Sequence, residues 1–113
     1  MATAFTIIAH PYDDRGKIFK WSLVSGETGE IAFIPHLQGD KTFQVVGTFN
    51  SSDCKLEGSI DPDDATTFLQ LKNLQGDNLL FTSADIESVA PACYAYRPVA
   101  GTGTAVTDYL FAR

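Results

Sequence analysis

Hydrophobic and polar residues alternate along much of this chain, and the alternation predicts β-strands. One stretch places Phe43, Val45 and Phe49 on one face and Gln44 and Thr48 on the other. A period of two is typical of an antiparallel strand with one buried face. These residues therefore predict a half-buried strand over 41–50.

Two further stretches repeat this pattern. The positions expected to face inward are Phe19, Trp21 and Leu23 in one stretch and Cys54, Leu56 and Ile60 in the other. The polar linker Ser51-Ser52-Asp53 separates residues 41–50 from residues 54–60 and is short. We therefore expect these two strands to pair as a hairpin.

A second hairpin is expected near the end of the chain. Residues 94–99 and 104–111 flank the turn-forming residues Ala100-Gly101-Thr102-Gly103. Both segments carry apolar residues in both phases, which is typical of strands covered on two faces. The cover would be another sheet or another subunit.

Two segments have a less regular pattern. Asp61-Pro62-Asp63-Asp64 supplies an N-cap followed by proline, which can open a helix. Two β-branched threonines follow, however, and Leu69 and Leu71 alternate with polar residues, which favours a turn followed by a strand. Residues 83–89 have room for one helical turn and no more.

Together the strands and the turns between them indicate one all-β domain over residues 1–113. We expect a single antiparallel β-sandwich of eight or nine short strands, with jelly-roll or Ig-like topology. Residues 1–20 are predicted to form an extended N-terminal arm. Phe5, Ile7 and Ile8 give this arm apolar side chains, so we expect it to lie against other protein, such as a neighbouring subunit.

The charge of the chain argues against two classes of partner. With 8 basic and 14 acidic residues, the formal net charge is −6. An acidic surface repels phosphate, so we expect no nucleic acid and no anionic membrane as partner. No apolar run approaches the length of about 18 residues that spans a bilayer, and the first ten residues do not resemble a leader peptide. We therefore expect synthesis in a cytoplasm.

Residues able to carry chemistry are few and scattered. His10 and His36 each lie beside a proline, and neither belongs to a nucleophile motif. The acidic turn 61–64 lacks the spacing of a calcium-binding EF-hand loop. The turn 101–103 lacks the lysine and the helix of a phosphate-binding loop. We therefore predict no catalytic residue, no metal site and no cofactor, and a protein that is not an enzyme.

The two cysteines are expected to be structural. The spacing of Cys54 and Cys93 matches no zinc or redox motif. In a reducing cytoplasm, such residues behave as small buried apolar side chains. We therefore expect free thiols.

Aromatic residues leave sugar binding open as an alternative. The rings considered for stacking on a sugar are those of Tyr12, Trp21, Tyr94, Tyr96 and Tyr109. Trp21 is in phase with the buried positions, so it is expected in the core. Tyr94 and Tyr96 share one face of a strand, where they would form either a sugar-binding platform or part of a protein interface.

The last two thirds of the chain resemble a known class of protein. The run "FQVVGTF" is followed by "KLEGSIDPDDATTFLQLKNLQGDNLLFTSADIESV", then by "YAYRP" and finally by "TDYLFAR". From Lys41 to Arg113, this order of turns and strands resembles small virion structural proteins of tailed bacteriophages, in particular head decoration (cement) proteins. The first 40 residues match this pattern less well.

The resemblance implies a structural function. It implies a protein on the outer surface of the phage head that binds the major capsid protein, stabilises the shell and forms a homodimer or homotrimer. An acidic surface suits the outside of a shell, away from the packaged DNA. The alternative is a carbohydrate-binding or host-adhesion module of a phage tail or head. The residues predicted to form a protein interface are Phe5, Ile7, Ile8, Tyr94, Tyr96, Tyr109 and Phe111.

Overall fold

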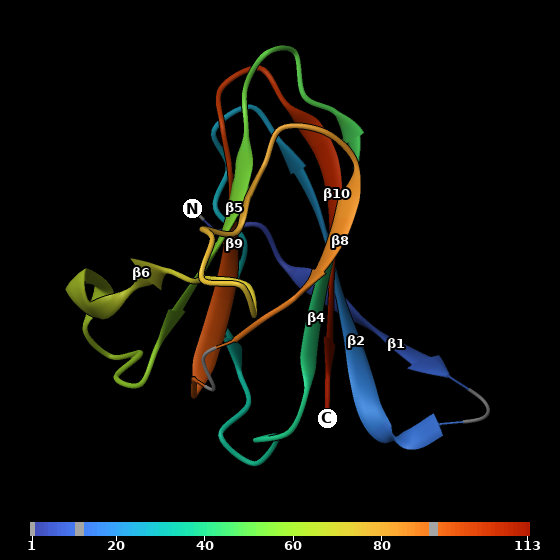
Figure 1. Ribbon diagram of the computed structural model, residues 1–113, viewed down its shortest axis with the longest axis vertical. Coiled ribbons are helices and arrows are strands. Elements are labelled where there is room, and N and C mark those ends of the chain that lie inside the picture. Colours follow the sequence, from blue (N-terminus) through green and yellow to red (C-terminus); the bar gives the residue numbers. More distant parts are fainter. Residues whose placement is uncertain (1, 11–12, 91–92) are drawn as a thin grey trace.

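The computed structural model describes residues 2–10, 13–90 and 93–113, apart from the side chains of residues 9, 10 and 13–15. The described residues form ten strands in two antiparallel sheets that face each other (Figure 1). Sheet I has the order β1 (Phe5–His10), β2 (Asp13–Val24), β10 (Ala105–Ala112), β4 (Lys41–Thr48) and β8 (Asp85–Ser88). Sheet II has the order β3 (Ala32–Phe33), β9 (Ala95–Ala100), β5 (Cys54–Ser59) and β6 (Leu69–Gln70), and β7 (Leu80–Phe81) also pairs with β5.

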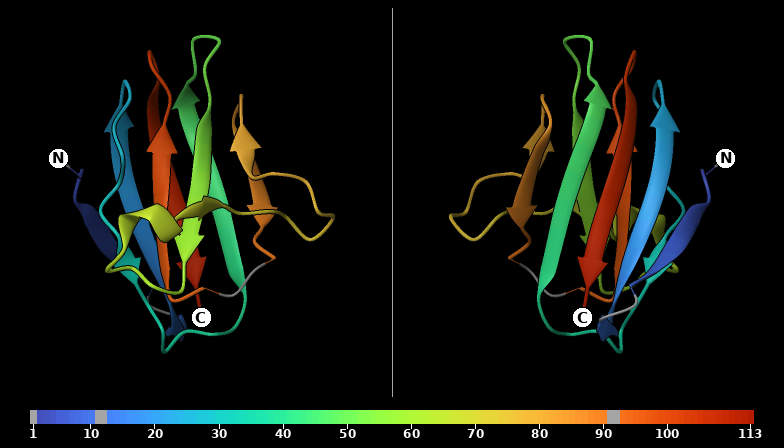
Figure 2. Two further views of the ribbon diagram at one scale, coloured as in Figure 1. Left: turned by 90° about the vertical axis from the view of Figure 1, so that its left-hand side faces the viewer. Right: turned by 90° about the vertical axis from the view of Figure 1, so that its right-hand side faces the viewer.

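The chain crosses between the two sheets at most of its connections. Successive strands alternate between the sheets from β2 to β5 and again from β7 to β10. The two sheets therefore lie against each other (Figure 2), as in a double-sheet jelly roll. The all-β sandwich expected from the sequence is confirmed, and of the two expected topologies it has the jelly roll. The strand number is higher than expected because β3, β6 and β7 have two residues each, too few to show a period.

Both expected hairpins are wrong in their pairing, although their strands exist. β4 pairs with β10 and β8, whereas β5 pairs with β9, β6 and β7. β9 and β10 likewise lie in different sheets. A short polar turn suits a hairpin and a crossing between sheets equally well, so its composition does not determine the pairing.

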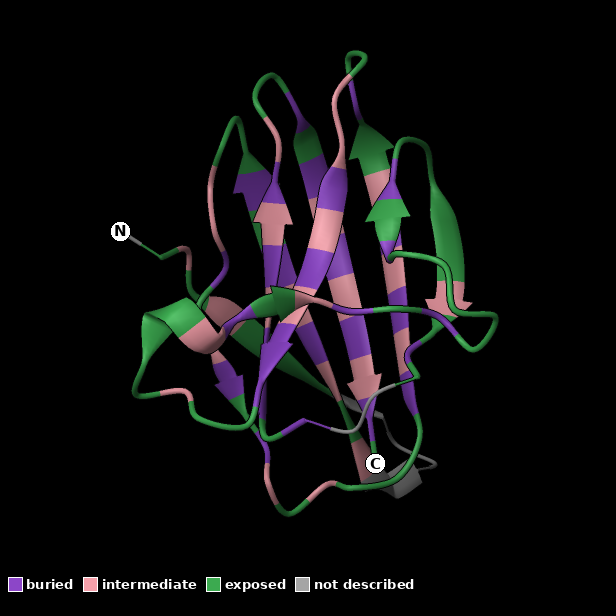
Figure 3. Cartoon of the chain, turned by 60° about the vertical axis from the view of Figure 1, so that its left-hand side comes forward, coloured by how far each residue is buried: buried purple, intermediate pink, exposed green. Residues whose placement is uncertain are grey.

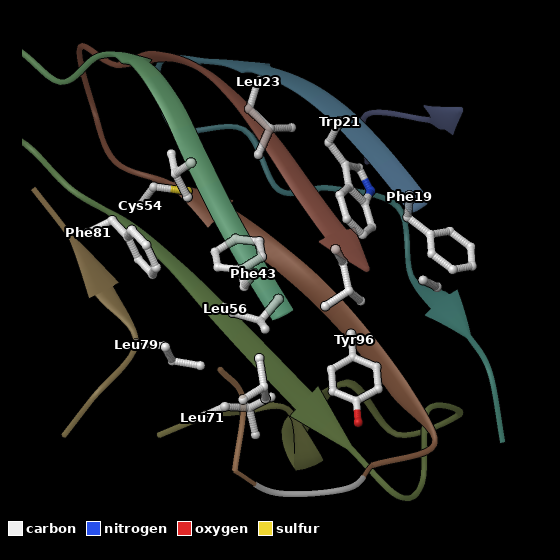
Figure 4. Packing of buried hydrophobic residues seen from close by; sticks show 14 of the residues in the cluster. Phe19, Trp21, Leu23, Phe43, Cys54, Leu56, Leu71, Leu79, Phe81 and Tyr96 are labelled. Atoms are coloured by element: carbon white, nitrogen blue, oxygen red, sulfur yellow. The ribbon is translucent and has the colours of Figure 1, made fainter. Parts of the chain in front are cut away.

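The core lies between the sheets and uses the positions that the alternation predicts. Phe19, Trp21 and Leu23 on β2, and Phe43 and Val45 on β4, are all buried. Their strands alternate between buried and less buried residues (Figure 3), and the buried side chains meet those of sheet II (Figure 4). The indole Nε1 of Trp21 donates a hydrogen bond of 3.0 Å to the carbonyl oxygen of Glu30, so the polar atom of this ring is satisfied.

Three local expectations are corrected. Ile60 is 70% exposed rather than buried, because β5 ends at Ser59 and the chain turns there. Residues 85–88 form strand β8 instead of a helical turn, since they pair with β4. The expected N-terminal arm is instead part of sheet I, where Phe5 lies opposite Trp21.

The acidic turn leads into a single 3-10 turn, η1 (Ala65–Thr67), and then into β6. The Oδ1 atom of Asp64 accepts hydrogen bonds from the backbone N–H and the hydroxyl of Thr66, at 3.0 and 2.7 Å. These bonds stabilise the ionised carboxylate, so the pKa of Asp64 is lowered. The expectation of a turn followed by a strand is therefore met, with one helical turn between them.

Candidate functional site

The side of sheet I that points away from the core carries a group of mainly apolar side chains. Directly opposite residues in an antiparallel pair share a face. In one row Phe111 lies opposite Thr42 on β4 and Ile18 on β2, and Ile18 lies opposite Ile8 on β1. In the next row Tyr109 lies opposite Gln44 and Lys20, and Gln44 lies opposite Ile86. We call this group the outer face; it consists of Ile8, Ile18, Thr42, Gln44, Ile86, Tyr109 and Phe111.

A shallow depression of about 140 Å³ lies in the middle of the outer face. Ile18, Ile86 and Phe111 supply much of its apolar lining. Ile86 is 56% exposed, whereas the side chains of Ile18, Tyr109 and Phe111 are each only partly exposed. The ammonium of Lys20 lies 5.9 Å from the centre of the Tyr109 ring, at the edge of the group. This arrangement is suited to burial against another protein.

The structure brings together three of the seven residues predicted to form an interface. Ile8, Tyr109 and Phe111 belong to the outer face. Ile7 lies on the opposite side of the edge strand β1, across from Phe19, and is 53% exposed. Phe5 is half-buried and packs edge-on against the rings of two core residues.

The two tyrosines of the predicted platform do not act together. Tyr96 is fully buried, so it is a core residue rather than a surface residue. Its hydroxyl oxygen accepts a hydrogen bond of 2.8 Å from the backbone N–H of Cys93. Tyr94 precedes β9 and is exposed. Of the other rings, Trp21 is in the core as expected, and Tyr12 lies outside the described residues.

Two central residues of the outer face were not predicted. Ile18 has the same phase as the outward residues of β2. An apolar residue at an outward position could have indicated a contact surface from the sequence alone. Ile86 lies in the segment expected to be helical, so its outward direction could not be assigned without its pairing to Gln44.

A second hollow lies at one end of sheet II. Its volume is about 630 Å³, and it is open to solvent. We call it the edge groove; its lining residues are Ile31, Phe33, Ile60, Asp61, Pro62, Asp63 and Tyr94. Exposed apolar side chains from β3, from the end of β5 and from the start of β9 therefore meet beside two carboxylates. Phe33 was not singled out in the sequence, and Ile60 was expected in the core, because nothing in the sequence shows that these two distant residues meet at the surface.

Among the described residues, one carboxyl group is buried in the core. Asp108 on β10 is fully buried, and its Oδ2 atom accepts a hydrogen bond of 2.9 Å from the Sγ–H of Cys54 on β5. Within the described part of the chain, Oδ1 of Asp108 has no hydrogen-bond partner. Burial raises the pKa of Asp108 to about 7, although the hydrogen bond from Cys54 opposes this effect. Burial likewise raises the pKa of Cys54, which keeps the thiol protonated.

The other residues considered for chemistry are dispersed. His36 is exposed, and the side chains of His10, Asp13 and Asp14 lie outside the described residues. No group of three or more His, Cys, Asp or Glu side chains that could hold a metal ion occurs among the described residues. Cys54 and Cys93 are both buried and are not bonded to each other. The described residues also include no helix of the length and hydropathy needed to cross a membrane.

Comparison with known proteins identifies the fold. No family model and no curated protein sequence matches the chain. Among solved structures, the SPBc2 prophage-derived protein YomS has a TM-score of 0.58 at 15% identity, over 91% of this chain and 98% of that chain. An RmlC-like cupin protein from Desulfovibrio desulfuricans has a TM-score of 0.54 at 10% identity, over 98% and 82% of the two chains. A cupin superfamily protein from Desulfitobacterium hafniense has a TM-score of 0.50 at 13% identity, over 97% and 78%. The chain therefore shares its jelly-roll fold with cupin proteins and with a protein derived from a prophage.

Proposed function

We propose that this chain is a bacteriophage capsid decoration protein. It binds the major capsid protein at the outer surface of the head and stabilises the shell. It is made in the host cytoplasm and assembles into the virion as a homodimer or homotrimer. The observation that carries the proposal is the apolar outer face of sheet I, which no described part of the chain covers.

The composition of the outer face fits a contact with another protein. Tyr109 and Phe111 are large rings beside the aliphatic Ile18 and Ile86. Complete burial of such a side chain contributes about 1.5–3 kcal/mol, and less where it is already half-covered. One protomer therefore binds weakly, but many protomers on one shell, or several in one oligomer, bind tightly through multivalency.

Charge and fold support the same proposal. The net charge of −6 is compatible with a position outside the shell and unfavourable next to packaged DNA. Jelly rolls are used in viral capsid proteins as well as in cupins and lectins, so the fold alone does not select one function. The resemblance of residues 41–113 to phage head proteins motivates the proposal, and the likeness to the prophage-derived YomS, at 15% identity, is one of fold.

The test is binding to expanded capsids of the phage that encodes the chain. The purified protein should sediment with the capsids and raise their melting temperature. The variants Ile86→Ser and Phe111→Ser should weaken both effects, because each removes an apolar side chain from the outer face. Leu74→Ser is the matched control, since Leu74 is 67% exposed and belongs to neither the outer face nor the edge groove.

Two results would contradict the proposal. One is that the wild-type protein neither sediments with the capsids nor changes their melting temperature. The other is that the outer-face variants bind as well as wild type and Leu74→Ser. Circular dichroism of each variant checks that the fold is retained.

A further inference from the structure

The strand at the free edge of sheet II has backbone groups available for a partner. β3 pairs with β9 on one side only, and Phe33 lies opposite Ala95. The backbone N–H of Ile34 donates to the carbonyl oxygen of Tyr94 at 2.7 Å. In an antiparallel ladder, alternate residues bond to the same neighbour, so the N–H and C=O of Phe33 point away from β9. An edge with such groups is a template for an additional strand.

The edge groove lies beside these groups. Phe33 is 56% exposed and Tyr94 is 45% exposed, and Ile60 lies with them in the groove lining. An extended peptide at a sheet edge gains affinity from the backbone and specificity from pockets that take alternate side chains. The groove supplies such a pocket for an apolar side chain.

The charge of the groove indicates what its occupant carries. Asp61 and Asp63 line it, and none of its lining residues is a lysine or an arginine. No described hydrogen bond or ion pair uses either of these two carboxylates, whereas the carboxylate of the neighbouring Asp64 is bonded to Thr66. The complement of two unpaired carboxylates next to an apolar pocket is a cationic side chain near an apolar one.

We propose that the edge groove binds an extended segment of another protein, which adds to β3 as a strand and carries lysine or arginine. The cation meets Asp61 and Asp63, and an apolar side chain of the segment packs between Phe33, Ile60 and Tyr94. A second copy of this chain is a poorer occupant, because its net charge of −6 repels the acidic groove. A sugar would use the exposed rings and carboxylates but would leave the strand edge unused. This inference does not depend on the decoration function, since it concerns a different sheet.

The test starts from selection of ligands by the full-length protein. The probe is a random library of ten-residue peptides, selected against immobilised wild-type protein. We expect the selected peptides to be rich in lysine or arginine and in β-branched residues, and their affinity to fall as salt is raised. In Asp61→Asn/Asp63→Asn their affinity should fall about tenfold or more. The matched control is Asp40→Asn/Asp77→Asn, which removes two exposed carboxylates outside the groove and should leave the affinity unchanged.

Hydrogen exchange distinguishes strand addition from binding by charge alone. On addition of a selected peptide, the amide of Phe33 should become protected by about tenfold or more, because it acquires a backbone hydrogen bond. Failure to select any peptide overturns the proposal, and so do selected peptides without basic residues or unchanged protection of Phe33. Binding of a glycan in the groove, without binding of any peptide, would show that the occupant is a sugar. A wild-type dimer that is lost in Asp61→Asn/Asp63→Asn would show that the occupant is a second copy of this chain, and either result would overturn the proposal. None of these outcomes depends on whether the protein binds capsids.

Discussion

The buried carboxyl group of Asp108 makes the stability of this domain depend on pH. Asp108 is fully buried between the sheets, and among the described residues Cys54 is its one hydrogen-bond partner. The neighbouring strands present apolar side chains to it, since Trp21 and Val45 lie directly opposite on β2 and β4. The lysines in the same phase on these strands, Lys17 and Lys41, both lie opposite Ala112, four residues from Asp108 and so about 13 Å away along β10.

The sign of the effect follows from the two states. In the folded protein the pKa of Asp108 is about 7, whereas its ordinary value is 3.8. Between these values the folded protein keeps a proton that the unfolded chain releases, so stability falls as pH rises from about 4 to 7 and then levels off. Each tenfold change in proton affinity is worth 1.36 kcal/mol, so this one group lowers the free energy of unfolding by about 4 kcal/mol over that range. A domain of this size has only about 5–15 kcal/mol in total.

The assay compares wild type with Asp108→Asn in urea unfolding at pH 4.5, 5.5, 6.5 and 7.5. The amide is nearly isosteric and does not titrate, so the variant lacks this contribution while all other groups titrate as before. We expect the stability of wild type relative to the variant to decrease steadily with pH. Cys54→Ala removes the donor that lowers the pKa of Asp108, so its decrease should extend to higher pH. Parallel pH profiles for wild type and Asp108→Asn would refute the reasoning.

Three further substitutions test the fold in the same urea assay. Trp21→Phe removes the bond to Glu30 and part of a buried ring, and should lower the free energy of unfolding by about 1–3 kcal/mol. Gly47→Ala should lower the free energy of unfolding by a similar amount, about 1–3 kcal/mol, because φ is +132° there and an added Cβ would clash with the carbonyl oxygen of Ala105. No loss of stability would show that the backbone is not held as described. Glu57→Gln should change the free energy of unfolding by less than about 1 kcal/mol, because its ion pairs with Arg97 and Lys55 are partly solvated, and a larger loss would contradict this view.

The sequence predicted the fold class and much of the core because the evidence for both is local. In β4, Phe43 and Val45 alternate with Gln44, and burial follows that phase. The pattern continues to the buried Phe49 across Gly47, whose positive φ would have been hard to infer from one sequence. The end of β5 was misplaced because Ile60 continues the alternation although the strand has ended. Alternation therefore identifies a strand better than it identifies the residue at which the strand stops.

The sequence could not predict which strands pair. The neighbours of β10 are β2 and β4, which lie far from it along the chain, and nothing in the turn after Ala100 excludes a pairing with β9. The outer face was accordingly predicted only in part: Ile8, Tyr109 and Phe111 were predicted as interface residues, but their neighbours Ile18 and Ile86 were not. Of the edge groove only Tyr94 was predicted as an interface residue, since the side chains of the groove converge from three separate segments.

The jelly roll separates the two proposed surfaces. The outer face belongs to sheet I, whereas the edge groove is formed at one end of sheet II, and the core lies between the sheets. Because the two surfaces share no residue, a protomer held on a shell through sheet I still presents the strand edge of sheet II. We therefore expect a selected peptide to bind shell-attached and free protein with affinities that agree within about twofold. Competition between shell and peptide, measured by fluorescence anisotropy of the labelled peptide, would show that the two surfaces are not independent, and the proposed attachment through sheet I would then have to be abandoned.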